Sequence, residues 1–131
     1  MQIIELTTDR NGLFEITKQV QEAVKKAGIT DGLAALWVPH STAGITVISK
    51  MDPLGFVDIE EEISRLVPTR VDFKHQFDTP SDAAGHIKSA IIGVSLTCII
   101  RDGALRLGSS QGIYFFEFDG PRQRQIYFQA G

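Results

Sequence analysis

The stretch Ile113-Tyr-Phe-Phe-Glu-Phe118 decides the fold, because it reads as one β-strand with large apolar side chains on both faces. An antiparallel sheet in a domain of this size usually buries only one face. Something must therefore cover the other face, either a second sheet or the surface of a partner subunit. We expect a compact antiparallel β-sandwich whose chains also assemble into a homo-oligomer.

Segments with the composition of strands lie on both sides of this stretch and are separated by turn residues. The pair Asp102-Gly103 is a strong signal for a two-residue hairpin, and Asp119-Gly-Pro121 marks another turn. These turns predict that the C-terminal part of the chain folds as an antiparallel meander. Besides the stretch already quoted, the strands that we expect cover residues 2–8, 33–39, 44–49, 94–100, 104–107 and 125–129.

The first helix is expected early in the chain. A turn at residues 9–12 is followed by a helical pattern that runs to about Ala27, and its apolar stripe starts with Phe14. Gly28 is a good helix end, because glycine readily adopts the left-handed conformation that commonly closes a helix.

Two further helices are expected in the middle of the chain. Pro53 fits the first turn of a helix at about 54–66, because the N–H that proline lacks would be unpaired there in any case. Ser81 or Asp82 can accept a hydrogen bond from a free backbone N–H and so cap a third helix at about 83–92. With about three helices among the strands, the sequence predicts the α+β class.

Composition places the chain among ordinary globular proteins. Its 131 residues, 43% of them hydrophobic and 22% charged, are enough for one core, so we expect residues 1–131 to form a single domain. A net charge of −3 disfavours binding to nucleic acid, whose phosphates attract basic proteins. The single cysteine, Cys98, lies in an apolar run and is expected to be an inert core thiol.

The chain carries no sign of export or of membrane insertion. No stretch approaches the roughly 20 apolar residues that cross a bilayer. The N-terminal residues Met-Gln-Ile-Ile-Glu-Leu lack the basic and apolar regions of a signal peptide. A single cysteine also suits a reducing compartment. We therefore expect a cytoplasmic protein with no membrane partner.

Only three histidines are present, His40, His75 and His86. Three imidazoles can bind zinc and leave a fourth position for water, which is the arrangement of catalytic zinc sites. The separations between these histidines match no short metal-binding motif, so the sequence leaves two interpretations open. They either share one metal site or are three separate histidines with structural roles.

Two segments near the C-terminus have the chemistry to bind an anion. Ser109, Ser110 and Gln111 lie between two glycines, and their amides and hydroxyls can form a cradle. Arg122 and Arg124 alternate along the last segment, so both lie on one face and can grip a phosphate or carboxylate. An ordinary connection between strands, and charges that protect an edge strand, are the alternative explanations.

Taken in order, these segments resemble the YjbQ family, also called the secondary thiamine-phosphate synthase enzymes. The similarity extends over nearly the whole chain, and it is specific because many short motifs occur in the same order. The motifs are His40-Ser-Thr-Ala-Gly-Ile-Thr46, Asp52-Pro53, Asp58, Val67-Pro68, His75, Ala84-Gly-His86-Ile-Lys-Ser89, Gly93-Val-Ser-Leu96, Asp102-Gly-Ala-Leu-Arg-Leu-Gly108, Gln111-Gly-Ile113 and Asp119-Gly-Pro-Arg-Gln-Arg124.

The resemblance implies an α+β sandwich that forms a homotrimer, with a histidine-rich site near a subunit boundary. It also implies a bound divalent metal, zinc first, for which His40, His75 and His86 are the matching positions and the catalytic residues. The family label implies condensation of a pyrimidine pyrophosphate with a thiazole phosphate as a weak side activity, so the expected substrate is another small phosphorylated metabolite. The residues expected to bind its phosphate are Lys88, Ser109, Ser110, Gln111, Arg122 and Arg124.

Two segments depart from the family pattern. Gly108-Ser-Ser-Gln111 stands where members carry Gly-Thr-Trp-Gln, so an aromatic wall is missing. Ile48 and Ser49 stand where members usually carry Asn-Glu, so a carboxylate suited to act as general acid, general base or metal partner is missing. Two functions therefore remain. The first is a metal-assisted enzyme acting on a small phosphorylated metabolite, and the alternative is a non-catalytic or vestigial oligomeric protein that binds a small anion.

Overall fold

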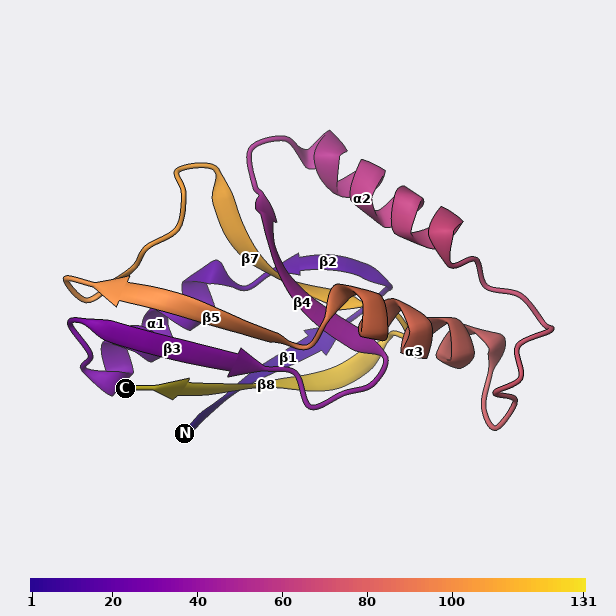
Figure 1. The fold of residues 1–131 in the computed structure, drawn as a ribbon, viewed down its shortest axis with the longest axis horizontal. Helices are drawn as coiled ribbons and strands as arrows, with labels where there is room; N and C mark the ends of the chain where they lie inside the picture. The colour runs from indigo at the N-terminus through magenta and orange to yellow at the C-terminus, as the bar shows by residue number, and fades with distance from the viewer.

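The computed structural model describes all 131 residues and contains three helices and eight strands (Figure 1). The strands form a five-stranded sheet of order β1-β8-β3-β5-β6 and a three-stranded sheet of order β2-β7-β4, and every strand pair is antiparallel. The elements are β1 (Gln2–Thr8), β2 (Gly12–Glu15), α1 (Thr17–Ala27), β3 (Gly32–Trp37), β4 (Ala43–Ser49), α2 (Pro53–Leu66), α3 (Pro80–Ile92), β5 (Ser95–Arg101), β6 (Ala104–Leu105), β7 (Gln111–Glu117) and β8 (Arg122–Ala130).

One hydrophobic core lies between the two sheets and α1. Leu36 and Phe128 from the five-stranded sheet and Ile45 and Phe115 from the three-stranded sheet are fully buried in it. Val20 on the apolar face of α1 closes the core at one side. Because each such side chain contributes about 1.5–3 kcal/mol when it leaves water, this core is the main stabilising element. The α+β sandwich expected from the sequence is confirmed.

The strand that decides the fold, β7, buries both of its faces. Ile113 and Phe115 point into the core between the sheets, whereas Tyr114 and Phe116 point to the other side. There they pack against α2, whose Phe56 ring lies 5.1 Å from the Tyr114 ring, centroid to centroid. A helix, rather than a second sheet or a partner subunit, therefore covers the second face of β7.

The first helix is shorter than the sequence pattern predicts. Gly12 has a φ of +132°, which an α-helix excludes, and the segment from Gly12 to Glu15 pairs with β7. Phe14 therefore lies in a strand, and α1 begins only at Thr17. The helix ends as expected at Gly28, whose φ of +68° is left-handed. Pairing with β7 outweighed the local helical pattern, because sheet contacts depend on distant residues.

The C-terminal strands do not form one continuous meander. Strands β5 and β6 make the expected hairpin at Asp102-Gly103, where both residues have positive φ. Strand β7 joins the three-stranded sheet, however, and β8 crosses to the other sheet, where it lies between β1 and β3. The crossing occurs at the Asp119–Pro121 turn, which contains a cis peptide bond between Gly120 and Pro121. The two sheets are thus joined by consecutive strands.

The third helix starts three residues earlier than expected, at Pro80. Thr79, rather than Ser81 or Asp82, caps it, because the Thr79 hydroxyl accepts a hydrogen bond from the Asp82 N–H at 3.1 Å. The Asp82 carboxylate is consequently not used for capping and is free to contact other side chains.

The expectations for Pro53 and Cys98 hold. Pro53 occupies the first turn of α2, and in the structure Asp52 caps this helix. Cys98 is buried in the core, and burial raises the pKa of its thiol, so it is unreactive. None of the helices has both the length and the apolar character that crossing a membrane requires.

A buried ion pair joins the two sheets where the chain crosses between them. Glu117 ends β7 and is 0% exposed, and Arg124 of β8 is 5% exposed. The guanidinium donates to both carboxylate oxygens, through Nε at 2.8 Å and through Nη2. Thr8 Oγ1 donates to Glu117 at 2.7 Å, and the Asp119 N–H donates at 3.1 Å. Burial alone would raise the pKa of Glu117, but these hydrogen bonds, that of Arg124 foremost, hold it below its ordinary value.

Replacing Arg124 by leucine should lower the free energy of unfolding by about 3–5 kcal/mol, because it leaves a buried carboxylate without its counter-ion. Arg122→Leu is the matched control, since Arg122 forms a partly exposed ion pair with Asp119, and it should cost less than about 1 kcal/mol. Urea denaturation at pH 7 measures both. Equal losses in the two variants would show that the buried pair does not hold the sheets together.

Candidate metal centre

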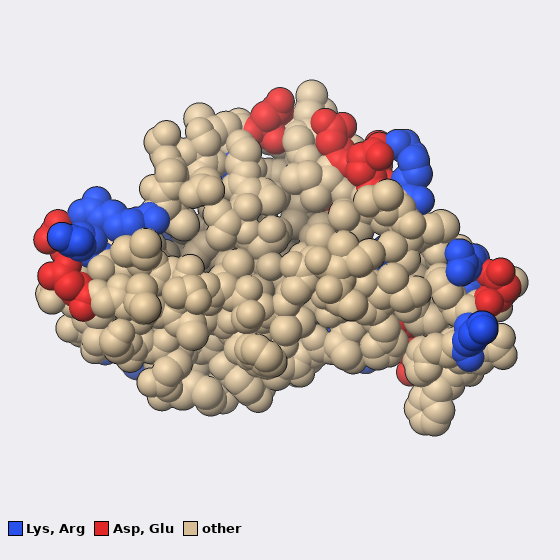
Figure 2. All heavy atoms as spheres, in the orientation of Figure 1, with Lys and Arg blue, Asp and Glu red and all other residues tan.

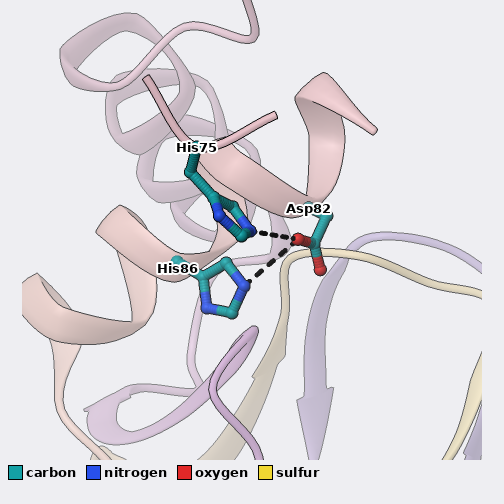
Figure 3. A group of neighbouring side chains, drawn as sticks. All are labelled: His75, Asp82 and His86. Atoms are coloured by element: carbon teal, nitrogen blue, oxygen red, sulfur yellow. Dashed lines mark hydrogen bonds and ion pairs between the residues drawn. The ribbon is translucent and has the colours of Figure 1, made fainter. Parts of the chain in front are cut away.

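Two histidines and one aspartate converge at the start of α3 (Figure 3). Asp82 and His86 are four residues apart on the helix, so they lie on one face, and His75 reaches them from the preceding segment. Oδ2 of Asp82 lies 3.1 Å from Nε2 of His75 and 3.1 Å from Nε2 of His86. The three ligand atoms all lie within 4.8 Å of one another. We call these three residues the His–Asp–His cluster.

Close packing of α3 on β4 fixes the position of the cluster. The Ser89 hydroxyl donates to the Ala43 carbonyl at 2.6 Å. Gly85 faces Thr42 so closely that an added Cβ would lie 3.2 Å from the Thr42 Cβ. A larger residue at position 85 would push the helix away from the strand. Helix α3 is therefore fixed to the sheet at Gly85 and at Ser89. Asp82 and His86 lie on this one helix, so their relative positions are fixed by it.

The environment of the cluster is buried on the aspartate side and open on the histidine side. The side chain of Asp82 is 12% exposed, against 46% for His75 and 37% for His86. The two imidazole rings meet edge to face with centroids 5.0 Å apart. A small apolar cluster lies beside the two histidines, since Phe73 and Ala83 line the same hollow as these rings. It consists of Val67, Phe73, Ala83 and Ala84. A ligand can thus approach from the histidine side.

The donor set is of a kind that divalent transition metals such as zinc accept. Imidazole nitrogens and carboxylate oxygens bind zinc at about 2.0–2.2 Å, so atoms that share one tetrahedral ion lie about 3.3 Å apart. The two separations of 3.1 Å from Asp82 Oδ2 are close to this value. The arrangement without a metal is also chemically complete, because both imidazoles can donate to the same carboxylate oxygen.

His40 does not join the cluster. It lies between β3 and β4, where its Nε2 accepts a hydrogen bond from the Gln125 N–H at 2.9 Å. This contact leaves the proton of the neutral ring on Nδ1 and occupies the other nitrogen. Burial, followed by the positive charge of Arg124, lowers the pKa of His40. His40 is therefore neutral at pH 7.

A hollow of about 610 Å³ connects His40 with one edge of the cluster. His40 and His86 both line it, and so does Trp37, whose side chain is half exposed. His86 also lines a smaller, mostly apolar hollow of about 410 Å³ together with His75. The structure thus brings His75 and His86 into contact, and it places His40 at the same hollow as His86 but outside the ligand group.

The predicted anion loop lies elsewhere. Ser109 and Gln111 line a hollow of about 660 Å³ beside α1, with Ser110 between them, and none of the histidines lines it. The Gln111 side chain accepts a hydrogen bond from the Gly108 N–H at 2.9 Å, which occupies part of the loop. Ser49 pairs with Gln111 across β4 and β7. The position where the family usually carries a carboxylate is therefore also at this end of the molecule.

The predicted basic residues do not reach the cluster either. Arg124 is engaged by Glu117, and Arg122 Nη2 donates to Asp119 Oδ2 at 2.9 Å. Lys88 is two residues from His86 on α3 and points to another side of the helix, because two residues correspond to about 200° of rotation. Burial lowers the pKa of Lys88. Within one chain, no phosphate clamp forms next to the His–Asp–His cluster.

The sequence does not single out Asp82 as a member of the cluster, because its carboxylate is expected there to cap the helix. The spacing Asp82-x-x-x-His86 was the available signal, since residues four apart share a helix face. Its meaning depended on where the helix starts. A start at Ala83 uses the carboxylate as a cap, whereas the observed start at Pro80 presents it to the histidines.

The ring of His40 should titrate below the ordinary pKa of histidine and should carry its proton on Nδ1, and ¹⁵N-resolved NMR measures both properties. Because the folded state disfavours the charged ring, the unfolded chain binds the proton more tightly. This contribution to stability is complete above the ordinary pKa and is lost as the pH falls from that value toward the lowered one. Titration at or above the ordinary pKa would refute the lowered pKa, and a proton on Nε2 would refute the assigned tautomer.

Comparisons with known proteins agree with this architecture. The family described as UPF0047 protein YjbQ-like matches residues 2–130. The UPF0047 protein MJ1081 of Methanocaldococcus jannaschii is 45% identical over 121 residues, which cover 92% of this chain and 86% of that protein. The UPF0047 protein YugU of Bacillus subtilis is 38% identical over 125 residues, which cover 94% and 92% of the two chains.

Solved structures show the same fold. The crystal structure of a YjbQ/UPF0047 family protein from Clostridium acetobutylicum has a TM-score of 0.93 and 37% identity, and the match covers 100% of both chains. That of a hypothetical protein from Aeropyrum pernix has a TM-score of 0.91 and 32% identity and covers 99% of this chain and 96% of that one. Since the sequence match spans nearly all residues and the folds coincide, the chain belongs to the UPF0047 family of YjbQ-like proteins.

Proposed function

We propose that the protein is a metal-assisted enzyme that acts on a small phosphorylated metabolite, with a divalent cation, zinc first, held by His75, Asp82 and His86. The observation that carries this proposal is the convergence of two imidazole nitrogens and one carboxylate oxygen within 4.8 Å. Three protein ligands leave a position for substrate, which is typical of catalytic zinc sites and not of structural ones.

The hollow next to the cluster supports the choice of substrate. A divalent cation bound here supplies positive charge that offsets the charge of a phosphoryl group. A ligand in the hollow contacts His86 and His40, and the neutral His40 ring can donate from Nδ1 to an anionic oxygen. The half-exposed indole of Trp37 offers a flat apolar surface for a ring or chain of the substrate. Weak thiamine-phosphate synthase activity, which uses two phosphorylated heterocycles, fits these requirements.

The alternative is a non-catalytic, vestigial oligomeric protein that binds a small anion. One observation favours it: the hollow at His40 and His86 contains no carboxylate that is free to act as a general base. Asp82 is shared by two histidines, and Ser49 lies at the other end of the molecule, beside Gln111. A protein of this kind would keep the pocket without the chemistry.

We also propose that the chains form a homotrimer in which the outer face of the five-stranded sheet is covered. Leu33 of β3 pairs with Ile99 of β5, and both side chains are more than half exposed, as is Trp37 on the same strand face. Figure 2 shows that charged side chains gather at the ends of the molecule and along α2, and that the middle of this face, over β3 and β5, has none. Because Trp37 also lines the hollow, the site would lie near a subunit boundary.

Elemental analysis of the untagged protein should find about one zinc or similar ion per chain. Asp82→Asn and His86→Ala should each lose the ion while circular dichroism shows an intact fold, because these side chains are ligands. His40→Ala is the matched control and should keep it. Loss of the ion in His40→Ala as well would support the set of three histidines as ligands. Well-folded protein that takes up no zinc would exclude the metal centre and leave the anion-binding alternative.

Catalysis should depend on the same residues. Zinc-loaded protein should turn over a phosphorylated metabolite, with thiamine phosphate formation as the first assay, and Asp82→Asn should reduce kcat by about 100-fold or more. His40→Ala should reduce it by about 10²–10⁴-fold if this ring donates to the reacting group. A zinc-loaded protein that turns over no member of a broad panel of phosphorylated compounds would favour the non-catalytic alternative.

Sedimentation velocity should detect a species of three times the 14.4 kDa chain mass. Ile99→Asp places a charge on the apolar sheet face and should yield the monomer, because an unpaired buried charge is costly. Val71→Asp is the control, since Val71 is 83% exposed and lies outside the sheet. A monomeric wild-type protein, or a trimer that tolerates Ile99→Asp, would mean that this face is not the interface.

A further inference from the structure

Lys88 is the unusual member of the buried charged residues. Four charged side chains of the chain are buried, namely Asp82, Lys88, Glu117 and Arg124. The other three all have ion pairs and hydrogen bonds, whereas Lys88, at 8% exposed, has neither. Its Nζ lies 6.0 Å from the centroid of the Phe118 ring, which is the outer limit of a cation–π contact. Most of this side chain is buried, but its ammonium remains accessible and has no partner within the chain, so it is available to a ligand that supplies such a contact.

The side chain of Lys88 lines a cavity of about 540 Å³ between α2, β7 and α3. Phe116 and Phe118 form an apolar wall of this cavity. Residues of α2 line another side of the cavity, and none of the residues of this helix is fully buried. Figure 1 shows where α2 lies relative to β7 and α3. The cavity contains none of the cluster residues. We call it the Lys88 cavity.

Two of the other charged groups in the cavity are already neutralised. Glu117 is held by the guanidinium of Arg124, and Arg65 pairs with Glu62 on the surface of α2. Neither can serve as the counter-charge for a ligand without losing its present partner. Lys88 is therefore the positive group that is available in the cavity.

Glu60 and Glu61 on α2 are the available negative groups. Glu60 Oε1 accepts a hydrogen bond from the Leu13 N–H at 2.7 Å, which leaves Oε2 for another donor, and Glu61 is exposed and has no ion pair. Figure 2 shows acidic side chains along the edge of the molecule that α2 forms. Neither carboxylate forms an ion pair with the ammonium of Lys88. The cavity therefore contains separated positive and negative groups.

We propose that the Lys88 cavity binds a small zwitterion, whose carboxylate or phosphoryl group contacts Lys88 and whose ammonium group contacts Glu60 and Glu61. A simple anion would gain the contact with Lys88 and be repelled by two carboxylates, whereas a ligand with separated charges satisfies both. The anionic end enters first, since Lys88 is the more buried group and Glu61 is exposed. A short aliphatic chain between the charges packs on Phe116 and Phe118.

Titration of the intact protein with glycine, 4-aminobutyrate and 6-aminohexanoate, followed by ¹H–¹⁵N NMR, tests the proposal. At least one of these should shift the signals of cavity residues and bind about tenfold or more tightly than acetate. Lys88→Met should weaken binding about tenfold or more, and Lys88→Arg should retain it. Glu61→Gln should reduce the preference over acetate. Lys88→Met should keep Tm, because the ammonium has no hydrogen bond or ion pair within the chain to lose, and this shows that lost binding is not lost folding.

The outcomes separate this proposal from the metal centre. Asp82→Asn should bind the amino acids as the wild type does, because Asp82 lies outside the Lys88 cavity. No shift with any of the three amino acids, or equal binding by Lys88→Met, would overturn the site. Acetate binding as tightly as the best amino acid would overturn the zwitterionic ligand.

Discussion

The requirement to bury both faces of β7 organises the molecule. One face packs on the opposite sheet and the other on α2, so β7 lies between these two layers. The strands before and after it in the chain, β6 and β8, belong to the other sheet. When the chain crosses from β7 to β8, two charged side chains are enclosed with it, and Glu117 and Arg124 are stable there only as a pair. That pair lies next to His40, whose neutral state depends in part on the charge of Arg124.

The same packing places the chemistry on α3. This helix lies against β4 through Ser89 and the bare backbone of Gly85, and it carries groups of different kinds on its different sides. Asp82 and His86 meet His75 on one side, where they form the cluster proposed to bind metal. Lys88 enters a separate cavity under α2. This helix lies between two hollows, and the two ligands proposed for them can be tested separately.

Most of the fold follows from local patterns, and the exceptions are contacts between distant residues. Turn residues and apolar periodicity identified nearly every strand and the helix end at Gly28, but not β2, since the position of Phe14 is set by pairing with β7. Family resemblance pointed to all three histidines. It did not reveal Asp82, because a helix start shifted by three residues turns an expected cap into a partner of the two histidines. Nor did it separate Arg122 and Arg124 into an exposed and a buried ion pair, which depends on the crossing between sheets.

The central proposal is that His75, Asp82 and His86 hold a single divalent cation beside the hollow at His40. Anomalous diffraction at the zinc edge, from crystals of zinc-loaded protein, tests it most directly. The account predicts one peak per chain at about 2.0–2.2 Å from Nε2 of both histidines and from a carboxylate oxygen of Asp82. A peak at any other place, or an ion-free cluster in which both imidazoles still contact Asp82, would contradict it.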